Sequence, residues 1–278
     1  MTSAIEVATM GDNCIDLYLP PLAKSSVGGQ SLNVAVMWAR MGWKTQYLGA
    51  VGADSQGRRI TSALANEGVD ISAVQVLARE SAQTTIEILP NGDRVLLIED
   101  QGACAEYAPT PAEISQLAGV KYLHAANLPN FRAVLAQLRK LKVPMSYDFS
   151  THHEVSDLEG LDIAFYSTPL SPEDPNLELL AKSAHKGGVS TVVITCGEHG
   201  SVVFENGTRT IVRAPSIDVI DSCGAGDTYA AVLISERLKG TPLTEAMVAA
   251  TSAASKNSLH YGPWEQEFEA EPNLSISQ

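Results

Sequence analysis

The chain has 278 residues, 45% of them hydrophobic and 18% charged, and its formal net charge is −13. This composition is typical of a globular protein with a sizeable core. The acidic balance argues against nucleic acid or an anionic membrane as a partner, because both attract basic surfaces. The four cysteines (Cys14, Cys104, Cys196 and Cys223) form no CxxC pair. We therefore expect reduced thiols, and neither a zinc site nor disulfides.

The first ten residues contain no basic region ahead of their apolar residues, so we expect no signal peptide. No apolar run in the sequence approaches the length of a membrane span. These two features predict a cytoplasmic protein. The length exceeds that of an average domain, yet single α/β domains of this size are common.

Strand-like and helix-like segments alternate along most of the chain, which predicts a mostly parallel sheet covered by helices on both faces. Short apolar runs predict the strands, and apolar residues at helical spacing predict the helices. In chain order, the expected elements are a strand at Ile5–Met10, a helix at Ser31–Met41, a strand at Thr45–Val51, a helix at Gln56–Glu67, a strand at Lys121–Ala126, a helix at Phe131–Leu141, strands at Pro144–Phe149 and Asp162–Ser167, a helix at Glu173–Lys186 and a strand at Thr191–Thr195.

Two segments alternate apolar and polar residues around an Asn-Gly pair, which is a strong hairpin signal. Thr84–Glu99 surrounds Asn91-Gly92, and Ser201–Arg213 surrounds Asn206-Gly207. We expect both hairpins to extend the sheet system, and the first to project as a lid over a site. The last residues, 265–278, are acidic and poor in large apolar groups, which predicts a disordered tail.

The most informative motif is Asp221-Ser222-Cys223-Gly224-Ala225-Gly226-Asp227, followed by a helical pattern over Tyr229–Lys239. The glycines lie at a helix N-terminus, where free N–H groups and the helix dipole favour an anion. Asp227 would repel that anion, but it suits a base that takes a proton from an attacking hydroxyl during phosphoryl transfer. The alternative is that Asp227 only complements the helix dipole and the glycines only form a turn.

Four further glycine-bearing motifs precede this one, at positions where strands end or helices begin: Gly11–Asp16, Gly28–Asn33, Gly52–Gly57 and Thr195–Gly200. The series resembles the PfkB (ribokinase-like) family of carbohydrate kinases over about residues 4–262. The two family signatures correspond to Gly28-Gly29…Asn33 and Asp221…Asp227. Within the family, the chain most resembles the bacterial fructoselysine 6-kinases, through Gly11–Cys14 with Asp16, Asp93–Val95, His124–Ala126, Asp148–Ser150 and Tyr261–Trp264.

This resemblance implies a ribokinase-like α/β kinase domain over residues 1–264, with a small β lid formed near 14–27 and 84–104. The implied activity is ATP-dependent phosphorylation, with Mg²⁺, of a primary hydroxyl on a ketose-amine such as the 6-hydroxyl of fructoselysine. Alternatives are a kinase for fructose, ribose or 2-keto-3-deoxygluconate, a non-catalytic sugar-binding regulator, or a nucleotide-binding scaffold. A hairpin lid cannot bury both of its faces alone, so we expect a homodimer through the lid.

The resemblance also assigns roles to residues. Asp227 corresponds to the catalytic base, and the N–H groups of Gly224, Ala225 and Gly226 correspond to the anion hole for the γ-phosphate. The expected sugar-binding residues are Asp16, Gly28, Gly29 and Asn33, together with Asn13 and Arg94 near the pocket. Arg94 is either a solvated lid residue or a cation for a carboxylate or phosphate. The expected nucleotide-binding residues are Thr195, Gly197, Gly200, Gly224 and Gly226.

The metal positions are the point where the chain departs from the family pattern. The usual Asn-x-x-Glu motif is absent from Ser167–Asp174, where only Glu173, with Asp174 beside it, is available to hold metal-bound water. Asp221 matches a position that lies near a monovalent cation, such as K⁺, in some relatives. His124 follows an apolar strand and is expected to be a core histidine. His152 and His153 are adjacent, so their side chains point apart, and both are expected at the surface.

Overall fold

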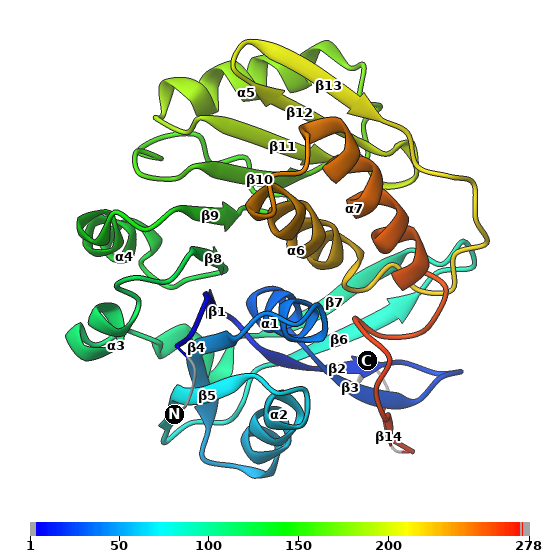
Figure 1. Ribbon diagram of the computed structural model, residues 1–278. Coiled ribbons are helices and arrows are strands. Elements are labelled where there is room, and N and C mark those ends of the chain that lie inside the picture. Colours follow the sequence, from blue (N-terminus) through cyan, green and yellow to red (C-terminus); the bar gives the residue numbers. More distant parts are fainter. Residues whose placement is uncertain (1–3, 273, 275–278) are drawn as a thin grey trace.

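The computed structural model describes residues 4–272 and residue 274. The larger of its two sheets contains β1 (Val7–Gly11), β4 (Thr45–Gly52), β5 (Asp70–Leu77), β8 (Tyr122–Ala126), β9 (Met145–Asp148), β10 (Ile163–Ser167), β11 (Thr191–Thr195), β12 (Ser201–Glu205) and β13 (Thr208–Val212). Their order across the sheet is β13-β12-β11-β10-β9-β8-β1-β4-β5. The strands from β11 to β5 run parallel, and β12 and β13 add an antiparallel hairpin at one edge (Figure 1).

Helices cover both faces of this sheet, as the alternating sequence pattern predicts. The helices α1 (Gln30–Arg40), α2 (Ser55–Asn66), α6 (Ala225–Leu238) and α7 (Leu243–Asn257) pack on one face, and α3 (Pro111–Gln116), α4 (Phe131–Leu138) and α5 (Pro175–Lys186) pack on the other. Successive strand residues serve opposite faces: Val7 packs with α1 and α6, whereas Ala8 belongs to the core under α3–α5. The predicted α/β architecture is confirmed.

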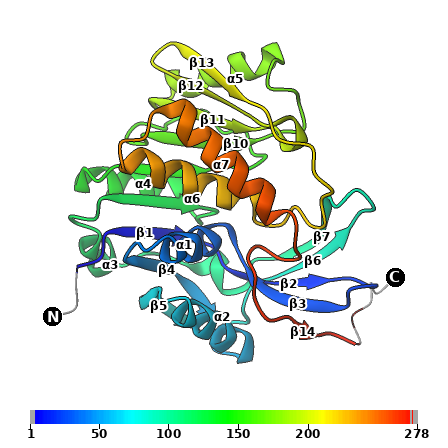
Figure 2. The same cartoon turned by 45° about the vertical axis from the view of Figure 1, so that its right-hand side comes forward.

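The second, smaller sheet forms the lid. It consists of β2 (Cys14–Tyr18), β3 (Lys24–Gly28), β6 (Gln83–Ile88), β7 (Arg94–Asp100) and β14 (Glu269–Ala270), in the order β14-β3-β2-β6-β7. It projects from the side of the larger sheet, and the C-terminal segment runs along its far edge (Figure 2). The segments 14–27 and 84–104, expected as lid from the sequence, supply four of these five strands.

The two faces of the lid hairpin differ in burial. On β6, Ile86 is 1% exposed and packs against Tyr18 and Cys223. On β7, every residue is exposed, and Leu96 and Ile98 are the most exposed of its apolar side chains. One face of the hairpin is thus covered by the chain itself, and β7 leaves apolar surface at an open sheet edge.

The disordered tail expected over residues 265–278 is wrong for residues 265–272. The side-chain amide of Gln266 both donates to the carbonyl of Val27 and accepts from its N–H group, each at 2.9 Å, in the manner of a neighbouring strand. Strand β14 then pairs with β3, and Glu269 forms a 3.1 Å ion pair with Arg59. These backbone and side-chain partners order an acidic segment that composition alone assigns to coil. Residues 273 and 275–278 lie outside the described residues.

Candidate active site

The site lies where the strand order of the larger sheet changes direction. β1 has β8 on one side and β4 on the other, and ligands of open α/β sheets bind outside the carboxyl ends of strands at such a point. Asp12 follows β1 directly. Its carboxylate accepts hydrogen bonds from the backbone N–H groups of Gln30 (3.1 Å) and Ser31 (3.0 Å). Asp12 thereby caps α1 and fixes the start of that helix at the carboxyl edge of the sheet.

Asp227 and Asn33 meet in this region from two different helices. Asn33 Nδ2 donates to Asp227 Oδ2 at 2.6 Å, and both residues are buried. Burial raises the pKa of Asp227 to about 8, the hydrogen bond from Asn33 acts to lower it, and the charge of Asp148 raises it further. A carboxyl group with a pKa in this range is suited to accepting a proton near neutral pH.

The N-terminus of α6 offers free N–H groups next to Asp227. Gly224 lies in the left-handed region at φ +72°, and a Cβ there would stand 2.5 Å from Cα of Pro263, so the position requires glycine. The N–H groups of Gly224, Gly226 and Asp227 have no acceptor within the described chain, whereas that of Ala225 donates to the Ser222 carbonyl at 3.3 Å. An anion is therefore best received by the amides that flank Ala225.

Asp16 lies on β2 with its carboxylate between two thiols. Cys14 Sγ donates to Oδ1 at 3.2 Å, and Cys223 Sγ donates to Oδ2 at 3.8 Å. Burial raises the pKa of Asp16 to about 6, although the bond from Cys14 and the charge of Arg94 act to lower it. Gly28 makes room for this carboxylate, because a Cβ at Gly28 would stand 2.2 Å from Asp16 Oδ2.

Asn13, expected near the sugar pocket, and His124, expected in the core, both bond to groups of the core. The side-chain amide of Asn13 donates to Tyr47 Oη at 2.9 Å and to the Ala50 carbonyl at 2.7 Å. Its backbone contacts Gly29, where a Cβ would lie 2.4 Å from Asn13 Cα. His124 is fully buried, with Nδ1 at 2.8 Å from Ser146 Oγ, and burial lowers its pKa to about 3. Asn13 and His124 therefore shape the core beside the site.

Arg94, on the lid hairpin, extends toward the segment that precedes α6. Its Nη1 donates to the carbonyl of Ser222 at 2.6 Å. Although Arg94 is exposed on β7, the protein around its guanidinium disfavours the charge, and the nearby carboxylates of Asp227 and Asp16 outweigh this and raise its pKa. The sequence leaves open whether Arg94 is a solvated lid residue or a cation for a carboxylate or phosphate. Its position favours the second alternative.

The expected nucleotide-binding loop lies between β11 and β12. Thr195 Oγ1 is 2.8 Å from Ser167 Oγ on the neighbouring strand. Gly200 has φ +103°, and a Cβ there would stand 2.1 Å from the Val212 carbonyl, whereas Gly197 faces open space. The hydroxyl of Ser201, just after this loop, is 2.9 Å from that of Tyr229 on α6. This bond ties the loop to the helix that carries the free N–H groups.

The two expected metal positions are already engaged by protein groups. The exposed carboxylate of Glu173 accepts from Ser171 Oγ at 2.6 Å and forms an ion pair with Arg213. Asp221 accepts from the N–H of Cys223 at 2.8 Å, from Tyr18 Oη at 3.0 Å and from the N–H of Gly262 at 2.8 Å. The donors around Asp221 do not fit a cation site. Within residues 4–272, no cluster of three His, Cys, Asp or Glu side chains is arranged to hold a metal.

Sequence reasoning did not assign Asp148 to the site. This buried carboxyl ends β9, accepts from the Ser150 N–H at 2.6 Å, and has its pKa raised to about 6 by burial. Its charge acts on Asp227, which places it toward the same region. The Asp148–Ser150 motif was the available signal.

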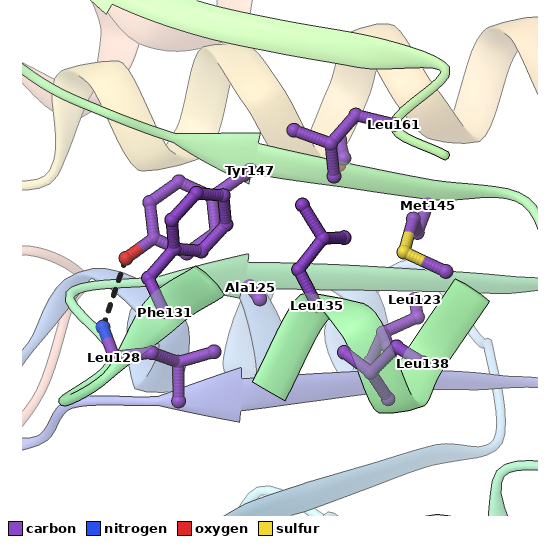
Figure 3. Close-up of a pocket in the computed structure, with 10 residues that line it drawn as sticks. Leu123, Ala125, Leu128, Phe131, Leu135, Leu138, Met145, Tyr147 and Leu161 are labelled. Carbon is purple, nitrogen blue, oxygen red and sulfur yellow. Dashed lines mark hydrogen bonds between the residues drawn. The ribbon is translucent and has the colours of Figure 1, made fainter. Parts of the chain in front are cut away.

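A separate cavity lies under α4 and is not part of the site. Apolar side chains from α4, β8 and β9, including Leu135, Ala125 and Met145, point into it (Figure 3). Its volume is about 10 Å³, which leaves room for one water molecule at most. Tyr147 also lines it, and its hydroxyl accepts from the N–H of Leu128 at 2.9 Å. We regard this cavity as an imperfection of core packing.

Comparisons with known proteins agree with this fold. The model of the pfkB family carbohydrate kinases matches residues 17–266. A fructoselysine 6-kinase of Shigella flexneri is 35% identical over 93% of this chain and 99% of its own length, and a fructosamine kinase of Bacillus subtilis is 29% identical over 93% and 92%. Arabidopsis thaliana ribokinase, solved with ribose and ATP, has a TM-score of 0.79 at 22% identity, covering 94% of each chain. No helix among the described residues is long and apolar enough to cross a bilayer.

Proposed function

Because this chain belongs to the pfkB family of carbohydrate kinases, we propose that it phosphorylates the 6-hydroxyl of fructoselysine or a related fructosyl amino acid, with Asp227 as the catalytic base. It is an ATP-dependent sugar kinase. The observation that carries the assignment of Asp227 is its place beside the free N–H groups of α6, with a pKa raised by burial to about 8. A base and an anion site lie side by side there, as transfer of a phosphoryl group to a hydroxyl requires.

On the sugar side, the carboxylate of Asp16 and the amide of Asn33 are the polar groups suited to hydroxyls. The buried Asn33 Oδ1 has no hydrogen-bond partner among the described residues, so it is available to accept from a substrate hydroxyl. Gly28 and Gly29 contribute by lacking a side chain, because a Cβ at either position would collide with Asp16 or Asn13. Arg94 supplies a cation for the carboxylate of the amino-acid half. The side-chain NH₂ of Asn13 is held by Tyr47 and Ala50, so its Oδ1, which has no hydrogen-bond partner among the described residues, is the atom left to accept from a substrate hydroxyl.

On the phosphate side, the N–H groups of Gly224, Gly226 and Asp227 receive the γ-phosphate, and Ala225 supports the turn. The loop with Thr195, Gly197 and Gly200 lies against the rest of the nucleotide. Mg²⁺ bound with ATP supplies positive charge to the phosphates, which this acidic chain otherwise repels. From its place in the sequence, Glu173 would hold a water molecule bound to that Mg²⁺. This role requires the ion pair between Glu173 and Arg213 to open.

The relatives support the proposed substrate class. The names of the fructoselysine and fructosamine kinases describe those proteins, and identity of 29–35% over nearly the whole chain supports the same class here. Kinases for ribose, fructose or 2-keto-3-deoxygluconate are the alternatives. A non-catalytic sugar-binding regulator is disfavoured, because binding a sugar without phosphoryl transfer requires neither a base such as Asp227 nor an anion site beside it.

A substrate panel tests this proposal. ATP consumption by the purified chain with Mg-ATP is measured on fructoselysine, other fructosyl amino acids, free fructose, ribose and 2-keto-3-deoxygluconate. We expect the highest kcat/KM for a fructosyl amino acid. Equal or better turnover of ribose or fructose would refute the substrate class and leave the kinase activity standing. Binding of sugar without ATP consumption would refute the kinase function itself.

Three further features belong to the proposal. The open, apolar edge at β7 supports a homodimer through the lid. A cytoplasmic location is consistent with four cysteines that are all free. The acidic surface disfavours nucleic acid as a partner.

A further inference from the structure

Three lid residues contact one short segment, residues 219–223, which leads directly into the anion site. Tyr18 Oη donates to Asp221 Oδ2 at 3.0 Å, and Arg94 Nη1 donates to the Ser222 carbonyl at 2.6 Å. The Ser222 N–H donates to the carbonyl of Gly92, at the hairpin tip, at 3.1 Å. These contacts join residues more than 120 positions apart in the sequence. Any shift of the lid is therefore transmitted to this segment.

Asp221 is the centre of these contacts. Its carboxylate is fully buried, and protein donors occupy both oxygens: the Cys223 N–H on Oδ1, and Tyr18 Oη with the Gly262 N–H on Oδ2. Two residues after Asp221, the carbonyl of Cys223 accepts from Asn257 Nδ2 at 2.7 Å. A buried charge held by several donors is rigid, because the loss of any one donor leaves it poorly compensated.

Tyr18 connects this centre to the sugar side. It is completely buried on β2, two residues after Asp16, so the two side chains leave the same face of the strand. Its ring packs against Phe268 with 5.7 Å between centroids. Burial raises the pKa of Tyr18 well above its ordinary value, so the hydroxyl remains a donor at any working pH. A movement of β2 would therefore displace the Tyr18 donor from Asp221.

We propose that Tyr18 is a positioning residue that couples sugar binding at the lid to phosphate binding at the N-terminus of α6, acting through Asp221. The inference rests on the proposed kinase function. Gly224 begins the anion site three residues after Asp221, so the orientation of the free N–H groups follows the position of this carboxylate. By linkage, sugar then strengthens ATP binding, and ATP strengthens sugar binding by the same factor.

The test is a binding cycle on the full chain. The Kd of a non-hydrolysable ATP analogue is measured with and without the sugar that turns over best in the substrate panel. In the wild type we expect tightening by a factor in the range of about 5–150 that is typical of coupled sites. Tyr18→Phe keeps the ring and removes the hydroxyl, and should bring this factor close to one. Tyr166→Phe is the matched control, because its hydroxyl contacts the Glu154 carbonyl and no lid residue.

The proposal would be overturned if sugar tightened the binding of the ATP analogue to Tyr18→Phe as much as to the wild type. It would also be overturned if sugar had no effect on the binding of the analogue to the wild type. If Tyr18→Phe fails to fold, Gly92→Ala gives a second route. A Cβ there would lie 2.4 Å from the Val219 carbonyl, so it pushes the hairpin tip away from the segment and should also lower the factor. Failure of the kinase function appears separately, as a wild-type chain that turns over no sugar in the panel.

Discussion

The amide of Asn33 donates a 2.6 Å hydrogen bond to the carboxylate of Asp227, although the two residues lie 194 positions apart. The bond acts against the burial that raises the pKa of Asp227. Asn33 therefore has two effects on the site: it orients the base, and it keeps more of that base ionised at neutral pH.

Replacement of Asp227 by asparagine tests whether this residue contributes to catalysis or only to the stability of the fold. Asp227→Asn should lower kcat by about 10²–10⁴-fold, because a positioned proton acceptor is lost. The folded-state pKa of about 8 lies above the ordinary 3.8, so the native state holds the proton more tightly than the unfolded chain. Stability is therefore lost as pH rises from about 4 to 8, and the neutral variant escapes that loss. At pH 8.5 it should melt at or above the wild-type temperature. Retention of more than about a tenth of wild-type kcat would exclude Asp227 as the base.

The pH dependence of turnover tests the contribution of Asn33. Because the base must be deprotonated, kcat/KM for the sugar should rise with pH to a plateau, with a midpoint near 8. Asn33→Ala removes the bond that lowers the pKa of Asp227, so the midpoint should move to higher pH. Ser146→Ala, which loses only the partner of the buried His124, should keep the wild-type midpoint. A profile that is unchanged in Asn33→Ala would contradict this account.

Substitution of Arg94 tests which anion this cation meets. Arg94→Gln should raise KM for a fructosyl amino acid more than KM for free fructose, because only the former carries a carboxylate. Steady-state kinetics with both sugars measure the difference. If Arg94 meets a phosphate instead, KM for ATP should change and the two sugars should be affected equally.

The response to salts tests the contacts of Asp221. Its two oxygens already hold three protein donors, so we expect equal turnover and equal melting temperature in KCl and in choline chloride at the same ionic strength. Higher activity and a higher melting temperature in KCl would show instead that K⁺ binds the folded chain, as the family resemblance suggests.

The open edge of the lid predicts the oligomeric state. Sedimentation at micromolar concentration should find a dimer, and Ile98→Glu, which places a charge at a 58% exposed position on β7, should weaken it. Leu179→Glu changes a 61% exposed leucine on α5 and should leave the dimer intact. A wild-type monomer under these conditions would exclude association through the lid.

Much of the fold was predictable because the strands of the larger sheet are short apolar runs. Thr191–Thr195 was predicted with the bounds that β11 has, and both Asn-Gly hairpins are present. Two of the elements left unassigned, β5 and β14, carry weak local signals, whereas the helix α7 (Leu243–Asn257) was missed despite its helix-favouring composition. Strand β5 has mostly half-buried or exposed residues, and β14 is a two-residue acidic strand that exists through its pairing with β3.

The candidate site was predictable where chemistry lies in a motif, as at Gly224–Asp227. It was not predictable where side chains are engaged by distant partners. Asn13 is turned toward Tyr47 and Ala50, and Tyr18 reaches Asp221 across 203 positions. No periodicity or spacing rule carries such information, since these bonds depend on how the lid and the larger sheet are placed together.

The two edges of the lid sheet are unlike, and this limits how copies of the chain can associate. At one edge, β14 and the amide of Gln266 occupy the hydrogen-bonding positions of β3. At the other, the outer side of β7 has no neighbouring strand among the described residues. Within the same residues, the outer side of β14 is unpaired as well, but β14 is only two residues long, so β7 is the one long edge that a second copy can extend. Association through this edge thus ends in a closed pair, whereas a sheet open at both edges can grow into a filament.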